Sequence, residues 1–184
     1  MLPLLLLSAC GGGETKHLQA PMAFRAELLN ADCCAFHADL RVDVHGRLYE
    51  ISADCRCDSD GASEITLTAP ETIAGVKARV DGKTGRLEFD GTAVDFGLPA
   101  DEDTAPVLLP GLLAKFWREG YILAAGEDEG LLQVSYEDDL HGSPIRAETW
   151  FDEQHVPVCA ELSADGAVFA WLTLDGLVMD GGTQ

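Results

Sequence analysis

The sequence predicts an α+β fold that is mainly antiparallel β: a strongly curved half-barrel of about ten or eleven strands enclosing one short apolar helix. Three observations support this prediction. Most of the chain alternates apolar and polar residues with the period of two that is typical of half-buried strands. The links between these segments are short and rich in glycine and aspartate, as in hairpins. One segment, about residues 104–118, has helical periodicity instead and is more apolar than a surface helix.

We expect the rest of the chain to fold around this helix. At about 100° per residue, its large side chains cover about half of the helix circumference. They are Leu108, Leu109, Leu112, Leu113, Phe116 and Trp117. We expect Asp103 or Thr104 to cap the helix, Pro110 to bend it near its start, and Gly120 to end it in a left-handed turn.

The chain of 184 residues can bury one sizeable core, and nothing in it resembles an interdomain linker. We therefore expect a single half-barrel domain over residues 22–184. Twelve basic and 32 acidic residues give a formal net charge of −20. Nucleic acid and bare anionic lipid surfaces are poor partners for such a chain, and we expect no nucleic-acid binding. The charge favours solubility, and a cation-binding acidic surface is the alternative.

The first ten residues form a short apolar run that ends in small residues before Cys10, as in a secretory signal and its cleavage site. Leu7-Ser8-Ala9-Cys10 resembles a bacterial lipobox, in which the cysteine is diacylated and becomes the first mature residue. We expect a signal peptide, truncated at its start, over residues 1–9, and a lipidated cysteine with a flexible tether over residues 10–21. The alternative is an apolar N-terminus that is not cleaved. The acyl anchor would hold the domain to the cell membrane on its extracytoplasmic side.

Residues 36–44 alternate cleanly and predict a half-buried antiparallel strand. His45-Gly46 can form a tight turn, after which the return strand continues the same apolar face. Pairing across this turn places Leu40 opposite Ile51 and Phe36 opposite Cys55. Both strands then agree on which face is buried.

Five cysteines remain if Cys10 is lipidated, an odd number that allows at most two disulfides; they are Cys33, Cys34, Cys55, Cys57 and Cys159. The hairpin register places Cys34 opposite Cys57 and on the same face as Cys55. A cross-strand disulfide from Cys34 is therefore allowed, whereas Cys33 points away. A four-cysteine zinc site is disfavoured because adjacent cysteines chelate one tetrahedral ion awkwardly.

The remaining strand-like segments share the same period. Before the helix they lie at residues 24–29, 65–69, 76–80, 87–89 and 94–96, and after it at residues 121–125, 131–136, 145–151, 156–162 and 168–174. Every link is short enough for a hairpin, which predicts an antiparallel meander. Twist accumulates in a sheet of this many strands until the sheet curls, and the apolar helix can occupy its concave face.

Several stretches together resemble the LolA/LolB-like lipoprotein-carrier superfamily, over roughly residues 22 to 180. Ile65-Thr66-Leu67-Thr68-Ala69-Pro70 is similar to its early strands, and Trp150-Phe151-Asp152 to its late hairpins. The resemblance implies an incomplete antiparallel barrel whose hollow is covered by helical segments and accepts acyl chains or other lipids. In this chain we expect the helix before the first strand to be absent or very short.

We accordingly predict a pocket for a lipid or other apolar small molecule between sheet and helix. Its candidate lining residues are Leu109, Leu112, Leu113, Phe116, Trp117, Phe89, Phe96 and Trp150. Plain core packing of the same side chains is the alternative. In that case the protein would be a protein-interaction or sensory module of the cell envelope with a sealed core.

The sequence contains no nucleophile elbow, zinc-protease motif or phosphate loop, so we expect no enzyme activity, cofactor or metal. His155 and Cys159 could form a thiol–imidazole pair, but we expect Cys159 to be a small core residue. His37 is expected on a solvated strand face. Asp58-Ser59-Asp60-Gly61 is interpreted as a hairpin loop rather than a calcium loop, because the other ligand positions lack acids.

Overall fold

The computed structural model describes residues 14–81, 84–97, 105–140 and 143–181. The predicted signal peptide, Cys10 and the predicted caps Asp103 and Thr104 lie outside these residues. The elements, in chain order, are α1 (Glu14–Asn30), β1 (Ala31–Val44), β2 (Arg47–Asp58), β3 (Ser63–Ala69), β4 (Lys77–Asp81), β5 (Thr84–Phe89), β6 (Thr92–Gly97), the 3-10 helix η1 (Pro106–Leu108), α2 (Leu109–Glu119), β7 (Tyr121–Asp128), β8 (Leu131–Leu140), β9 (Ser143–Phe151), β10 (Pro157–Ala164) and β11 (Ala167–Gly181).

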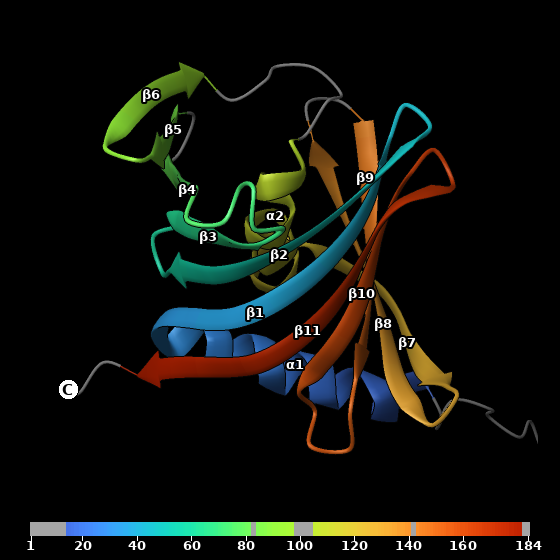
Figure 1. Ribbon diagram of the computed structural model, residues 1–184. Coiled ribbons are helices and arrows are strands. Elements are labelled where there is room, and N and C mark those ends of the chain that lie inside the picture. Colours follow the sequence, from blue (N-terminus) through green and yellow to red (C-terminus); the bar gives the residue numbers. More distant parts are fainter. Residues whose placement is uncertain (1–13, 82–83, 98–104, 141–142, 182–184) are drawn as a thin grey trace, which may run out of the picture.

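The strands form one antiparallel sheet of eleven in the order β6-β5-β4-β3-β2-β1-β11-β10-β9-β8-β7. The sheet curves strongly around α2 and leaves β6 and β7 as separate edges, which confirms the predicted half-barrel (Figure 1). The predicted simple meander is wrong in one respect. The first and last strands pair at the centre of the sheet, so that two meanders, β1–β6 and β7–β11, are joined through β1 and β11. The segment containing η1 and α2 connects the two edges.

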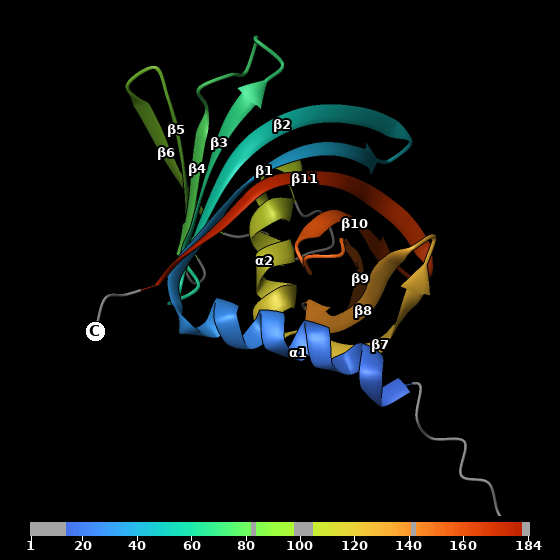
Figure 2. The same ribbon diagram turned by 90° about the horizontal axis from the view of Figure 1, so that it is seen from below.

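Residues 14–30 form helix α1, where the sequence had led us to expect a tether followed by a strand over residues 24–29. The expected absence of a helix before the first strand was therefore also wrong. Phe24 and Leu28 are both buried, and their spacing of four residues fits one face of a strand as well as one face of a helix. Pro21 lies inside the helix. Figure 2 shows α1 lying across the open side of the half-barrel, below α2.

The register of the first hairpin is the predicted one. Leu40 lies opposite Ile51 and Cys34 opposite Cys57. The turn places His45 and Gly46 at φ values of 53° and 77°, and the Gly46 amide donates a 2.7 Å hydrogen bond to the Asp43 carboxylate. The strict alternation and the two-residue turn thus fix which side chains enter the core.

The predicted central helix is confirmed as η1 followed by α2. Pro110 lies in the first turn of α2, where no hydrogen bond is lost, so it begins the helix instead of bending it. Gly120 does not adopt the expected left-handed conformation, because its φ is −57°. A Cβ atom there would lie 2.6 Å from the Phe116 carbonyl oxygen, and one at Gly111 would lie 2.8 Å from Ser63 Oγ on β3. Close packing is therefore what requires glycine at both positions.

Candidate ligand-binding site

The apolar side of α2 lies against the concave face of the sheet and forms the centre of the core. Its largest side chains are completely or almost completely buried, with exposed fractions of 0 to 1% for Leu109, Leu113, Phe116 and Trp117. Leu112 is partly buried and packs against the same cluster. The structure thus brings together the five helix residues among the eight predicted lining residues.

Trp117 is the side chain that joins α2 to both halves of the sheet. Its indole Nε1 donates a 3.1 Å hydrogen bond to Thr149 Oγ1 on β9. Its ring lies edge-on to Phe24 of α1, with centroids 5.7 Å apart, and is tilted against Phe36 of β1 at 5.4 Å. Because the only indole donor is satisfied inside the core, the ring can be buried without a polar penalty.

Two of the other three predicted lining residues, Phe89 and Trp150, do not join this cluster. The Phe89 side chain is 49% exposed, and that of Phe96 lies outside the described residues. Trp150 lies between Thr149 and Phe151, which both face the core, so its side chain points to the outer face of β9. There its indole Nε1 donates a 2.8 Å hydrogen bond to Asp128 Oδ2. The alternation of β9 predicts this outward direction, whereas residue type alone favoured the hollow.

Arg25 on α1 is a site residue that sequence reasoning missed. Its Nε donates to the Trp117 carbonyl at 2.8 Å, and its Nη2 donates to the Gly120 carbonyl at 2.6 Å. Its guanidinium lies 5.7 Å from the centre of the Tyr136 ring. A positive charge at this position satisfies the free carbonyls at the C-terminal end of α2 and complements the helix dipole. Arg25 therefore fastens α1 to α2.

Two polar groups inside the hollow have atoms without a hydrogen-bond partner in the described part of the chain. Arg118 is only 8% exposed, and its Nε and Nη2 have no hydrogen-bond partner within the described residues; the same holds for the Tyr136 hydroxyl. The Arg118 guanidinium lies near Cys34 and Cys57. A buried charge without a carboxylate partner is costly, so these groups can receive the polar end of a bound molecule.

Cys34, Cys55 and Cys57 all face the core, and within the described residues all five cysteines are free thiols. A hydrogen bond to Cys57, together with burial, raises the pKa of the Cys34 thiol well above its ordinary value. Cys33 faces β11, where its thiol lies 3.5 Å from Asp180 Oδ2. Cys34 and Cys57 thus have the pairing geometry that a cross-strand disulfide needs, and that bond stays a prediction.

Oxidation of the purified protein with a glutathione disulfide buffer is expected to link Cys34 to Cys57. The bond would close a loop across the first hairpin and raise the free energy of unfolding by about 3 kcal/mol. Peptide mapping of the alkylated protein identifies the linked pair, and urea unfolding measures the gain. Cys34→Ser should lose both effects, whereas a bond to Cys55 or Cys33 in the wild type would contradict the pairing.

The thiol–imidazole pair considered from the sequence is not assembled. Cys159 pairs with Trp150 and Thr173 on the outer face of the sheet, so its expected place in the core was wrong. Burial, followed by the nearby Glu161 carboxylate, raises the pKa of its thiol, which favours the unreactive protonated form. His155 is exposed in the turn between β9 and β10 and lines a separate, smaller pocket.

His37 lies on the solvated face of β1, as predicted, between two acidic side chains. Its Nδ1 lies 2.7 Å from Asp54 Oδ1, and its Nε2 lies 3.6 Å from Asp39 Oδ1. The hydrogen bond to Asp54 raises the pKa of His37, with a further contribution from the Asp39 charge. The arrangement is a surface ion-pair cluster.

The stability contribution of His37 is expected to depend on pH. Because the folded-state pKa lies above the unfolded value of about 6.5, the contribution is fully present below that value and is lost as pH rises through the folded-state pKa. Exposure limits it to less than about 1 kcal/mol. Urea unfolding of wild type and His37→Gln at about pH 5.5 and about pH 8 should show a difference only at the lower pH. A constant difference would contradict this assignment.

The segment Asp58-Ser59-Asp60-Gly61 forms the turn between β2 and β3, as predicted. The Gly61 amide donates to the Asp58 carbonyl at 3.1 Å, and the Ala62 amide donates to Asp60 Oδ1 at 3.0 Å. The Asp60 side chain and the Asp58 backbone carbonyl thus stabilise a hairpin loop. As for membrane insertion, neither helix of the described residues combines the length and apolarity that a transmembrane span requires.

No protein-family model matches the sequence, and no curated protein matches it. Several solved structures match over nearly the whole chain. A LolA superfamily protein from Nitrosomonas europaea has a TM-score of 0.50 at 8% identity, covering 91% of this chain and 94% of its own. A putative outer membrane lipoprotein-sorting protein domain from Vibrio parahaemolyticus has a TM-score of 0.52 at 10% identity, covering 92% and 94%. A DUF1329 family protein from Desulfovibrio piger has a TM-score of 0.52 at 10% identity, covering 95% and 96%.

Identities this low establish the architecture alone. In this chain the architecture is one open, strongly curved antiparallel sheet around a central helix, and it agrees with the fold that the strand periodicity and the apolar helix predicted. The chain therefore has a LolA-like fold.

Proposed function

We propose that this protein is a non-enzymatic, extracytoplasmic bacterial lipoprotein whose half-barrel binds a lipid or another apolar ligand against α2. One observation carries the proposal: the wide apolar face of α2 is enclosed by the concave side of an open sheet. The shared fold with a lipoprotein-sorting domain supports it as an analogy. On this proposal, residues 1–9 are the signal peptide that directs export, and Cys10 carries the acyl chains that attach the protein to the membrane.

Ligand entry on this proposal requires a movement, because Leu109, Leu113 and Trp117 of α2 are fully covered and α1 lies across the open side (Figure 2). Helix α1 is the natural lid, since its buried side chains are few, namely Pro21, Phe24 and Leu28, and Arg25 supplies its hydrogen bonds to α2. Exposing the two large apolar side chains, Phe24 and Leu28, costs about 1.5–3 kcal/mol each. Burial of each CH2 of a ligand contributes about 0.8 kcal/mol, so an acyl chain of about ten carbons offsets this cost. We therefore favour a long-chain ligand.

The second candidate is a protein-interaction or sensory module of the envelope with a permanently sealed core. The complete burial of Leu109, Leu113 and Trp117 favours it, because such packing resembles an ordinary protein interior. In this case the helices would move only when the domain unfolds.

Native mass spectrometry and organic extraction of the purified protein distinguish the two candidates. The carrier should release apolar material and bind a fluorescent long-chain fatty acid. Leu112→Asp, at the edge of the α2 cluster, should weaken that binding, whereas Leu123→Asp, at an exposed position of β7, should leave it unchanged. A protein that contains no lipid and binds no fatty acid would be the sealed module.

The anchor is tested separately with Cys10→Ser in a bacterial host. The variant should move from the membrane fraction to the soluble extracytoplasmic fraction, because one acylated residue supplies the attachment. Continued membrane association of the variant would contradict the proposed lipid anchor on Cys10. It would not bear on the proposed ligand binding.

A further inference from the structure

The outer face of the sheet carries a groove with a volume of about 760 Å³, on the side opposite to α2. Its lining comes from seven adjacent strands, from β3 through β2, β1, β11, β10 and β9 to β8, and from the last residue of β7 with the turn that follows it. At a strand spacing of about 4.8 Å, the six steps between these seven strands follow a path of about 29 Å along the curved sheet. The groove is therefore elongated across the strands, and its size suits a ligand longer than a simple cation.

The charges along this outer groove are strongly unbalanced. Its charged lining residues are Asp39, Glu50, Asp128, Glu129 and Glu161 against Arg41. Within the described part of the chain, no hydrogen bond or ion pair engages the carboxylates of Glu50, Glu129 and Glu161. Unpaired carboxylates at both ends and in the middle of one groove create a negative potential along its length, since the groove concentrates their field.

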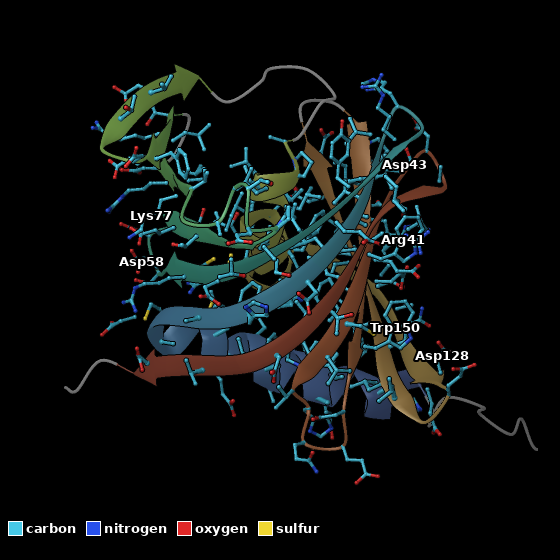
Figure 3. The ribbon with its side chains drawn as sticks, viewed as in Figure 1. Arg41, Asp43, Asp58, Lys77, Asp128 and Trp150 are labelled. Atoms are coloured by element: carbon cyan, nitrogen blue, oxygen red, sulfur yellow. The ribbon has the colours of Figure 1, made fainter. Side chains whose placement is uncertain are left out.

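Two indole rings stand among these carboxylates. Trp171 is 36% exposed, and the Arg41 guanidinium lies 5.6 Å from its ring centre, so one cation already occupies a ring in this groove. Trp150 is held by its hydrogen bond to Asp128. Figure 3 shows Trp150, Asp128 and Arg41 on the outer side of the sheet. Indole faces attract lysine and arginine side chains, and the attraction strengthens as the pair is desolvated.

The sheet register holds these groups in a fixed row. Glu161 pairs with Trp171 across β10 and β11, Trp171 with Arg41 across β11 and β1, and Arg41 with Glu50 across β1 and β2. Acidic and aromatic side chains therefore lie side by side on consecutive strands, each about one strand spacing from the next. Such a row can contact several cationic side chains of one extended chain.

We propose that the outer groove binds an extended, basic segment of a partner protein, with lysine or arginine side chains over the indoles and paired with the carboxylates. The length of the groove and the spread of its charges favour a polypeptide over a compact cation. The site lies on the opposite face of the sheet from the proposed lipid site, so it does not depend on that function. Arg41 occupies the groove as a competitor of the incoming cations.

The proposal is tested with a fluorescein-labelled octapeptide of alternating lysine and glycine, by fluorescence anisotropy at about 0.15 M salt, where long-range attraction is screened. Glu50→Gln combined with Glu161→Gln should weaken binding roughly tenfold. Glu27→Gln combined with Glu71→Gln removes the same charge from exposed positions outside the groove and should have almost no effect. Trp171→Leu should weaken binding roughly threefold or more.

Arg41→Gln should change binding in the opposite direction. Removing the competing guanidinium frees Trp171 and Glu50 for the peptide, and a roughly threefold gain in affinity is expected. Arg47→Gln, at the exposed first residue of β2, makes the same charge change and should give almost no gain. All these positions lie on the surface, so thermal unfolding should confirm that the variants fold.

Three results would overturn the inference. One is the absence of peptide binding by the wild type. Another is equal weakening by the groove pair and the control pair, which would mean that the net charge of the protein attracts the peptide without a site. The last is displacement of the peptide by spermine at equal charge concentration, which would assign the groove to compact polycations.

Discussion

Trp117→Ala is expected to lower the free energy of unfolding by about 3–5 kcal/mol, as do other truncations of fully buried aromatic residues. Trp117 is 0% exposed and touches three parts of the molecule: α1 through Phe24, β1 through Phe36 and β9 through Thr149. Its removal leaves a cavity between these elements and an unpaired Thr149 hydroxyl. Because α2 fills the half-barrel, the surrounding strands cannot collapse onto the cavity without losing their own packing.

Urea unfolding followed by far-ultraviolet circular dichroism measures this loss. Trp171→Ala is the matched control, because it removes the same side chain from the outer face, where Trp171 is 36% exposed and its loss leaves no enclosed cavity. Trp117→Phe should fall between the two, since it keeps a ring but loses the indole donor. Equal losses for Trp117→Ala and Trp171→Ala would show that α2 is not the centre of the core.

The sequence predicted those parts of the fold in which the spacing of the apolar residues fits only one type of secondary structure. In β1 and β2 the alternation is strict and the turn is short, so the pairing of Leu40 with Ile51 follows directly. The apolar face of α2 is too wide for a surface position, which predicted its burial. The start of the chain was misread because Phe24 and Leu28 satisfy either period.

The candidate sites were harder to predict because their neighbours are distant in the sequence. Arg25 reaches the carbonyl of Gly120 only after both helices have docked. The outer groove exists only because β1 pairs with β11, which brings Arg41 beside Trp171. Aromatic residues were assigned to the hollow by type, whereas Trp150 is sent outward by its position between Thr149 and Phe151. Strand parity would have corrected that assignment, but no local pattern predicts the helix docking.

Arg25→Ala is expected to cost about 2–3 kcal/mol of unfolding free energy, because hydrogen bonds from a charged donor contribute more than neutral ones. The substitution leaves the carbonyls of Trp117 and Gly120 without their donor at the C-terminal end of α2. It should also loosen α1 before the rest of the domain, since Arg25 is the polar link between the two helices. Hydrogen–deuterium exchange should therefore accelerate in residues 14–30 more than in β1 or β11.

Arg25→Lys separates charge from geometry in this contact. A single ammonium group keeps the favourable charge at the helix end but lacks the planar fork that reaches two carbonyls at once, so most of the loss should remain. Arg47→Ala, at an exposed hairpin position, should cost almost nothing. If α1 opens faster in Arg25→Ala and fatty-acid binding accelerates with it, the helix acts as the lid of the hollow. If exchange in α1 stays as slow as in the wild type, Phe24 and Leu28 hold the helix by themselves, and entry beneath α1 loses its support.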